Sequence, residues 1–192
     1  MGERVRVLHV SEASWGGVVS LIREFTAQQV ARGHQVGLLS PPIAPAIDGV
    51  DCRSWSISRR RIDTYPLAVR ELKRAIHEFE PDVVHLHSFM AGFIGRLPLT
   101  TGLLPVVYQP HAWAFNVSES RSLRRAVVAW ERFAGRRTKV LVVNCQDACF
   151  RGRPRQGRQP HVLVLHWPIT TADPCDSCRR CRRRLRRGSS WR

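Results

Sequence analysis

Three groups of residues that could bind or act on a ligand follow short apolar runs of the chain. Gly16 and Gly17 lie between one such run and a helical pattern, His87 and Ser88 end a second run, and His111 follows a third. Two glycines before a helix let backbone N–H groups approach a phosphate, whose negative charge the helix dipole favours. An imidazole among aromatic residues can hydrogen-bond a sugar hydroxyl. These residue types therefore favour a ligand that carries phosphate or hydroxyl groups.

Each group also has a structural interpretation, which stays open at this point. A pair of glycines is commonly a tight turn, Ser88 could be the N-cap of a helix, and a histidine in a loop, such as His111, is more often incidental. His85 is expected to be a buried, hydrogen-bonded histidine. Because side chains alternate along a strand, His85 and His87 should point to one face and Leu86 to the other. The glycine segment matches neither the GxGxxG fingerprint nor the lysine-bearing P-loop, so an ordinary dinucleotide or nucleoside-triphosphate site has little support.

Apolar runs and helical patterns alternate through the first three-quarters of the chain. Strands are predicted near residues 5–10, 35–39, 52–57, 82–86, 105–108 and 139–144, with helices near residues 18–33, 72–79, 90–97 and 118–136. Residues 161–165 could form one more strand, which Trp167 and Pro168 would end. The last helix should bury Leu123, Val127, Trp130 and Phe133 on one face. Strands that alternate with helices predict an α/β fold, a Rossmann-like open parallel sheet with helices on both faces. Ligands bind such sheets beyond the carboxyl ends of the strands, where the three groups lie.

Composition and charge divide the chain into two parts. Of its 192 residues 43% are hydrophobic, which excludes wholesale disorder. The net charge is +16, but residues 151–192 hold 12 arginines and two aspartates and so account for +10 of it. We therefore expect a folded domain over residues 1–149 and a basic, disordered tail over residues 150–192.

No signal for membrane insertion or export is found in the sequence. Arg96 and Pro98 interrupt the most apolar stretch, which is shorter than the roughly 20 residues that span a bilayer. The residues after Met1 lead into a strand pattern without the apolar core of a signal peptide. A cytoplasmic protein is expected.

The tail suggests a competing function. Cys175, Cys178 and Cys181 resemble part of an iron–sulfur run, and Cys145 with Cys149 could add zinc ligands. An arginine block binds nucleic acid non-specifically by counterion release. A protein that binds nucleic acid or metal through this segment is the alternative, although arginine fills the intervals and the usual fourth cysteine is absent, which favours accidental cysteines.

Several segments, in order, resemble the N-terminal half of the GT-B glycosyltransferases of retaining family 4. They cover about three-quarters of the chain. The matching segments are residues 7–12 with Gly16–Gly17 (first strand and glycine loop), 31–36 ("RGHEV"), 81–88 ("PDVVHxHS"), 91–96 (the helix after it) and 106–111 ("TPHG", with Ala112 in place of the last glycine).

The resemblance implies transfer of a hexosyl group from a nucleotide-sugar to a glycan or lipid-linked acceptor, with retention of configuration. By this resemblance Gly16 and Gly17 face the donor diphosphate, and His111 lies beside the transferred sugar as the catalytic residue. Glu12, His87 and Ser88 line the cleft. The nucleotide-sugar is a co-substrate, and neither a cofactor nor a metal is expected. Peripheral contact with an anionic membrane is a further expectation, whereas specific nucleic-acid binding is not expected.

The sequence also departs from the family pattern. Complete members carry a second Rossmann domain with a basic pair and a glutamate-rich motif, and residues 151–192 contain no glutamate. We hypothesise that the chain from about residue 146–151 onward comes from a shifted reading frame, and that the truncated chain is inactive or impaired by itself. Reading the coding DNA past codon 145 in the other frames tests this. A half-domain that works with a separately encoded donor-binding subunit is a third possibility.

Overall fold

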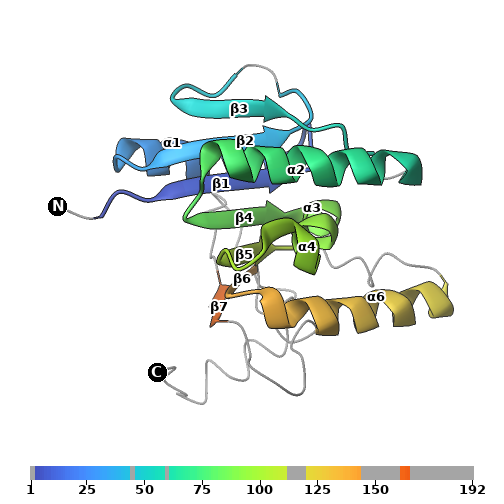
Figure 1. The fold of residues 1–192 in the computed structure, drawn as a ribbon. Helices are drawn as coiled ribbons and strands as arrows, with labels where there is room; N and C mark the ends of the chain where they lie inside the picture. Colours follow the sequence, from blue (N-terminus) through green and yellow to red (C-terminus); the bar gives the residue numbers. More distant parts are fainter. Residues whose placement is uncertain (1–2, 44–45, 59–60, 112–119, 144–160, 165–192) are drawn as a thin grey trace, which may run out of the picture.

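The computed structural model describes residues 3–43, 46–58, 61–111, 120–143 and 161–164. Its described strands form one parallel sheet in the order β3-β2-β1-β4-β5-β6-β7 (Figure 1). The direction in which strands are added reverses at β1: β2 and β3 extend the sheet on one side of β1, and β4 to β7 extend it on the other. The strands are β1 (Arg6–Ser11), β2 (Gln35–Ser40), β3 (Val50–Ser54), β4 (Val83–His87), β5 (Val106–Gln109), β6 (Val140–Val143) and β7 (His161–Val164).

Helices follow most of the strands and cover the sheet. Short 3-10 turns lie at η1 (Ile62–Thr64) and η2 (Gly135–Arg137). Figure 1 shows α2, α3, α4 and α6 on the near side of the strands. The helices are α1 (Gly17–Ala31), α2 (Tyr65–Phe79), α3 (Ser88–Gly95), α4 (Pro98–Thr101) and α6 (Arg121–Ala134).

The two faces of the sheet carry different side chains. One face is apolar and joins α2, α3 and α6 in a single core cluster, which includes Leu8, Leu72, Leu86, Ile94, Tyr108 and Val127. The other face holds imidazoles: side chains alternate along a strand, so His9 in β1 and His85 and His87 in β4 point away from that cluster. Phe25 of α1 packs against them, with ring centroids 5.8 Å from His85 and 6.4 Å from His87. Helix α1 thus covers the histidine face.

Helix α3 lies unusually close to the sheet because two of its residues are glycines. A Cβ atom at Gly92 would lie 2.2 Å from the ring of Tyr108, and one at Gly95 would lie 2.5 Å from Leu86. A larger residue at either position would require the ring of Tyr108 or the side chain of Leu86 to move. This close approach fixes the helix that begins at Ser88.

A buried ion pair ties α6 to the end of α3. Arg96 donates two 2.9 Å hydrogen bonds to the carboxylate of Glu131 and a third, at 2.8 Å, to the carbonyl of Gly92. Its guanidinium also stacks 3.7 Å from the ring centre of Tyr108. Both charges are almost fully buried, with side chains 1% and 7% exposed. The bidentate geometry compensates for their desolvation.

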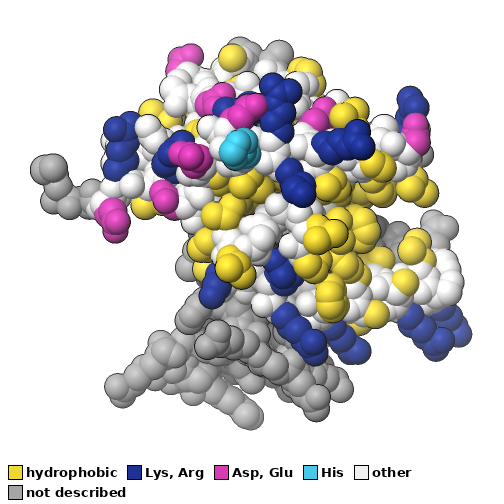
Figure 2. All heavy atoms as spheres, viewed as in Figure 1, with side chains coloured by type: hydrophobic (Ala, Val, Ile, Leu, Met, Phe, Trp, Pro, Cys, Tyr) yellow, Lys and Arg dark blue, Asp and Glu magenta, His cyan; other side chains and the backbone are white. Residues whose placement is uncertain are grey.

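The predicted α/β sheet is confirmed. The predicted strands and helices begin and end within a few residues of their expected limits, apart from α2, which begins at Tyr65; the short helix α4 was not predicted. Helix α6 differs in its orientation: Val127 is buried as expected, but Leu123 and Phe133 are about half exposed. Figure 2 shows apolar side chains gathered between α2 and α6, with lysine and arginine side chains along the outer side of α6.

Residues 161–164 form the further strand that the sequence allowed for. They fall in the segment that we assigned to the tail, yet β7 pairs with β6 in parallel, with Val140 opposite His161. The domain limits remain a prediction, because the rest of the segment from residue 144 onward lies outside the described residues. Among the described helices, none has the length and apolar content that a membrane span requires.

Candidate functional site

Three adjacent strands end side by side at the carboxyl edge of the sheet. Ser11 is paired with His87, and His87 with Gln109. The loops that follow β1, β4 and β5 therefore begin next to one another. The strand order reverses between β1 and β4, which is where open α/β sheets bind ligands. We call this place the carboxyl-edge site; it comprises Glu12, Gly16, Gly17, His87, Ser88 and His111.

The glycine loop after β1 leaves the N-terminus of α1 uncapped. Gly16 is the N-cap residue, with φ 84° and ψ −169°, a conformation open to glycine almost exclusively. No side chain caps this end, and its first turn contains no acidic residue. A Cβ atom at Gly16 or Gly17 would meet nothing within 4 Å among the described residues. The free N–H groups and the open space suit an anion.

Glu12 connects the first loop to the second. Its carboxylate accepts hydrogen bonds of 3.2 Å from the backbone N–H groups of Met90 and Ala91 in the first turn of α3. The negative charge lies at the positive end of that helix dipole. The N-terminus of α3 is therefore occupied by the protein's own carboxylate, whereas that of α1 is not.

Backbone strain is concentrated at this edge. Among the described residues, three non-glycine residues have positive φ, and two of them are Ser88 (68°) and His111 (55°). Such conformations cost of the order of 1–3 kcal/mol each and persist where the surrounding structure imposes them, often at ligand sites. Ser88 is not the N-cap that one interpretation predicted: it is the first residue of α3, and His87 is the cap.

The histidines form a hydrogen-bonded row. Nδ1 of His9 lies 2.9 Å from Nε2 of His87, and Nδ1 of His87 lies 3.2 Å from Nε2 of His111. The row continues at its other end to Gln29 in α1, whose Oε1 lies 2.8 Å from Nε2 of His9. Side chains from α1, β1, β4 and the loop after β5 are thereby linked.

Burial keeps these imidazoles neutral. Desolvation lowers the pKa of His9, against the opposing bond from Gln29, to about 4, and it lowers the pKa of His111 to about 4. The pKa values of His85 and His87 are lowered well below the ordinary value, mainly by burial and further by the neighbouring histidines. Each ring therefore has one donor and one acceptor nitrogen at neutral pH.

The structure changes the expectation for His87. We expected it to line the cleft, but its side chain is fully buried. His87 therefore reaches the carboxyl edge only through its contact with the half-buried ring of His111. His85 is buried as expected and lies on the same face as His87, with ring centroids 4.0 Å apart. The Nε2 atom of His85, however, has no hydrogen-bond partner among the described residues.

Three of the buried imidazoles could in principle hold a metal. His9, His85 and His87 each offer a nitrogen, and these nitrogens lie within 4.8 Å of one another. Imidazole is a common ligand of zinc. His9 and His87, however, already use one nitrogen each in the 2.9 Å bond between them. In the structure the ring nitrogens of His9 and His87 take part in the hydrogen-bonded row instead.

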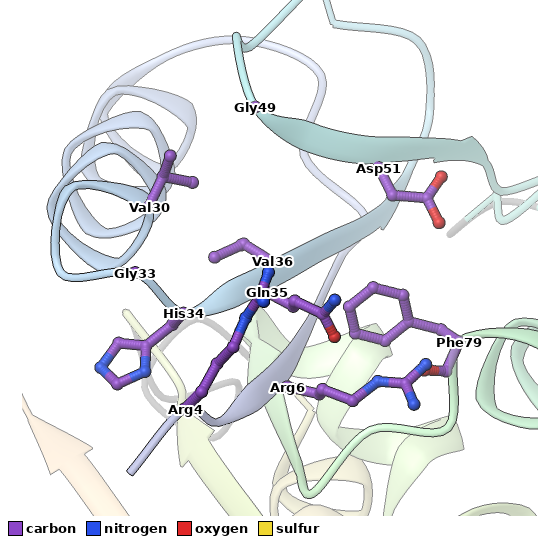
Figure 3. A pocket seen from close by; sticks show the side chains of 10 residues that line it. All are labelled: Arg4, Arg6, Val30, Gly33, His34, Gln35, Val36, Gly49, Asp51 and Phe79. Carbon is purple, nitrogen blue, oxygen red and sulfur yellow. The ribbon is translucent and has the colours of Figure 1, made fainter. Parts of the chain in front are cut away.

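A pocket at the opposite, amino edge of the sheet is a weaker candidate. Figure 3 shows Arg4, Arg6, Asp51 and Phe79 around it, with α1 on one side. Its most buried cation, Arg6, is held by Glu80 at 3.1 Å and by the carbonyl oxygen of Phe79. These contacts are structural, and strands of this kind bind ligands at the other edge.

Sequence reasoning missed His9 and Gln29. The register pairs His9 with His85 across adjacent parallel strands, and that pairing was the available signal, because two strands with a histidine at the same level place the rings together. Gln29 gives no sequence signal, since it lies among other polar residues of a helix and only the packing of α1 brings it to His9.

Comparison with known proteins gives one family. The sequence matches the model of Glycosyltransferase Family 4 over residues 15–173. It is 24% identical over 145 residues to an uncharacterized 41.2 kDa protein in the cps region of Klebsiella pneumoniae, covering 73% of this chain and 40% of that protein.

Solved structures with a similar fold include those of a sucrose-phosphate synthase and of HepE. A sucrose-phosphate synthase from Thermosynechococcus elongatus aligns with a TM-score of 0.65 and 14% identity, over 84% of this chain and 48% of that one. HepE of Anabaena, in complex with UDP-glucose, aligns with a TM-score of 0.59 and 15% identity, over 84% of this chain and 44% of that one. At these identities the likeness concerns the fold. The chain spans less than half the length of each of these relatives.

Proposed function

Since the chain belongs to Glycosyltransferase Family 4, we propose that it forms the acceptor-side half of a glycosyltransferase that uses a nucleotide-sugar donor. The observation that carries the proposal is that an uncapped helix N-terminus, at Gly16 and Gly17, and an imidazole, His111, lie on loops that leave β1 and β5 at the same edge of the sheet, on either side of β4. A complex of the structural neighbour HepE contains UDP-glucose, which supports a uridine nucleotide-sugar as the donor class.

The glycine loop would bind the donor diphosphate. The leaving group of such a transfer gains negative charge as the bond to the sugar breaks, and fixed donors aimed at it stabilise the transition state. The N–H groups at the start of α1 are of this kind, and neither a side chain nor an acidic residue competes for them in the first turn. Glu12, whose carboxylate accepts hydrogen bonds from the first turn of α3, would hold the glycine loop in place without contacting the diphosphate.

His111 would contact the transferred sugar. Its ring is neutral at pH 7, because burial lowers its pKa, so it can exchange a hydrogen bond with a sugar hydroxyl without attracting the phosphates. We further propose that the transfer retains the anomeric configuration and that the acceptor is a glycan or a lipid-linked glycan. The donor is a co-substrate, and no metal or cofactor takes part in this proposal.

Helix α6 would bring the domain to an anionic membrane. Helix α6 carries the half-exposed apolar residues Leu123 and Phe133 together with exposed arginines (Arg121, Arg124, Arg125, Arg132). Two further exposed apolar residues, Leu99 and Leu103, lie in and just after α4. A basic helix with apolar side chains at its surface is typical of interfacial binding. Cosedimentation with phosphatidylglycerol vesicles, but not with phosphatidylcholine vesicles, is expected, and it should fall when Arg124 and Arg125 are replaced by glutamate. Equal cosedimentation of the charge-reversed chain would refute the membrane contact.

Saturation-transfer NMR on the full chain tests the donor class. With UDP-glucose, GDP-mannose and glucose as probes, at least one nucleotide-sugar is expected to receive saturation, and free glucose much less. Gly17→Ala should weaken that signal several-fold, whereas Gln28→Ala, an exposed residue near the other end of α1, should leave it unchanged. Absence of saturation for every nucleotide-sugar would remove the proposal.

The alternative based on the Arg/Cys segment remains a prediction. Its cysteines, Cys145 to Cys181, lie outside the described residues. The hypothesis of a shifted reading frame also stays a prediction; the segment that it concerns includes β7, which pairs with β6. Metal analysis and a salt-dependent RNA shift, each compared with a chain ending at Phe150, distinguish it from sugar transfer.

A further inference from the structure

The row of side chains from Gln29 to His111 has a defined direction. A neutral imidazole has one N–H donor and one bare nitrogen, so each hydrogen bond in a row of imidazoles decides the next. With the oxygen of Gln29 facing His9, Nε2 of His9 donates at 2.8 Å, and its bare Nδ1 accepts from Nε2–H of His87 at 2.9 Å. The bare Nδ1 of His87 then accepts from Nε2–H of His111 at 3.2 Å.

The last ring is left with one nitrogen outside the row. Because Nε2 of His111 is committed as the donor to His87, its Nδ1 carries a lone pair and can only accept. A lone pair attracts a hydroxyl hydrogen and repels the oxygens of phosphate or carboxylate. The row therefore determines which kind of ligand group can face His111.

We propose that Gln29 and His9 are positioning residues, which fix His111 in the Nε2–H tautomer so that its Nδ1 accepts a hydrogen bond from a hydroxyl of the bound sugar. This extends the function proposed above and depends on it only for the identity of the ligand. His9 is fully buried, and Gln29 lies near the opposite end of α1 from Gly17, about 18 Å along the helix axis. Neither residue needs to touch the ligand to act.

Two other arrangements of the same atoms predict different results. If the amide nitrogen of Gln29 faced His9, every bond would reverse and Nδ1 of His111 would become a donor. If a metal joined His9, His85 and His87, the bond between His9 and His87 would be lost. The positive φ of His111 shows a backbone held in place by its surroundings, and the bond to His87 orients the ring.

Long-range proton–nitrogen NMR of the full chain with 15N-labelled histidine tests the tautomers without any ligand, because protonated and bare ring nitrogens resonate in separate ranges. At pH 7.5 we expect a protonated Nε2 and a bare Nδ1 for His9, His87 and His111. Gln29→Leu should remove the anchor and give His111 a mixture of tautomers. Gln29→Glu, whose side chain only accepts, should keep the native one.

The neighbouring exposed Gln28 provides the control. Gln28→Leu should leave all histidine signals as in the native chain, and an unchanged amide spectrum in the remainder of each variant shows that the fold is kept. A single, unchanged tautomer of His111 in Gln29→Leu would overturn the proposal. So would a protonated Nδ1 on His111 in the native chain.

Titration with UDP-glucose and with UDP tests the consequence for binding. Loss of one hydroxyl hydrogen bond should weaken UDP-glucose roughly three- to tenfold in Gln29→Leu and leave UDP unchanged. A changed tautomer with unchanged binding of UDP-glucose would refute the role of the row in recognition. Absence of binding of UDP-glucose and of GDP-mannose in the native chain, with the tautomers as expected, would instead refute the proposed function and leave the tautomer assignment intact.

Discussion

The ring of His111 lies against that of His87, with Nε2 of the first 3.2 Å from Nδ1 of the second. One ring is half-buried at the carboxyl edge, and the other is fully buried between the sheet and α1. This contact joins the surface where a ligand would bind to an interior that contains further imidazoles. It also makes both the stability of the fold and the chemistry of the edge sensitive to protonation.

Acidification should destabilise the domain below about pH 6.5. An unfolded histidine titrates near pH 6.5, whereas burial lowers the pKa of His9 and of His111 to about 4, so the unfolded state binds more protons between these values. Stability is full above pH 6.5 and is lost as the pH falls toward 4, by about 2 kcal/mol at pH 5 for each such histidine. Urea unfolding at pH 7.5 and pH 5 measures the difference.

A variant of an exposed histidine controls for that experiment. His77 lies on the exposed side of α2, and His77→Gln should preserve the full pH dependence. Equal free energies of unfolding at the two pH values would show that the buried histidines are not held neutral.

Glu12→Ala should loosen the first turn of α3. The carboxylate accepts from two backbone N–H groups, of Met90 and Ala91, and loss of a comparable helix cap costs about 0.5–2 kcal/mol. Hydrogen exchange at these two amides should accelerate. Glu12→Gln keeps one accepting oxygen, so its exchange rates at these amides should lie between those of the native chain and of Glu12→Ala. Equal exchange rates in all three chains would contradict the contact.

The two glycines of the first loop should respond differently to alanine. Gly16→Ala forces a side chain into a backbone conformation of φ 84°, at a cost of about 1–3 kcal/mol. Gly17 is the first helical residue and has open space around it, so Gly17→Ala should keep or slightly raise the unfolding free energy while it weakens the binding of UDP. Urea unfolding and a UDP titration test both.

Alanine should be tolerated at Gly17 but not at Gly92 in α3. Gly92→Ala should prevent normal folding because its Cβ would lie 2.2 Å from the ring of Tyr108. Stable folding of that variant would show that α3 can move away from the sheet.

Removal of one partner of the buried ion pair should be costly. Glu131→Ala leaves the charge of Arg96 buried without its bidentate partner, and such changes cost about 3–5 kcal/mol. Replacing both residues by apolar ones, Arg96→Met with Glu131→Leu, should recover much of that loss. If urea unfolding gave Glu131→Ala the same unfolding free energy as the native chain, the packing of α6 would not depend on the ion pair.

Much of the fold could be predicted from the sequence. Parallel strands covered on both faces are short apolar runs, so β1, β4 and β6 were predicted from local composition, as was the helix around Val18 to Phe25. Orientation was harder: the apolar residues of α6 predicted one buried face, but the pair between Glu131 and Arg96 turns that helix so that Phe133 is half-exposed.

The site was predictable in its location and less so in its contacts. Gly16 and His111 follow strands, and topology brings strand ends together, so their shared edge could be inferred. His9 was missed because its only signal is the strand register, which places it at the level of His85, and the sequence does not state that register directly. Its bonds to His87 and Gln29 depend on the packing of α1 against the sheet, which is a tertiary property.

Amide shift mapping tests the central claim most directly. The 15N-labelled full chain is titrated with UDP-glucose while the backbone signals of every described residue are followed. The account predicts that the largest shifts occur at Gly16, Gly17, Ser88 and His111, with little change at Arg4, Arg6 and Asp51 around the pocket at the amino edge. Shifts concentrated at that amino-edge pocket, with the carboxyl edge unaffected, would contradict it.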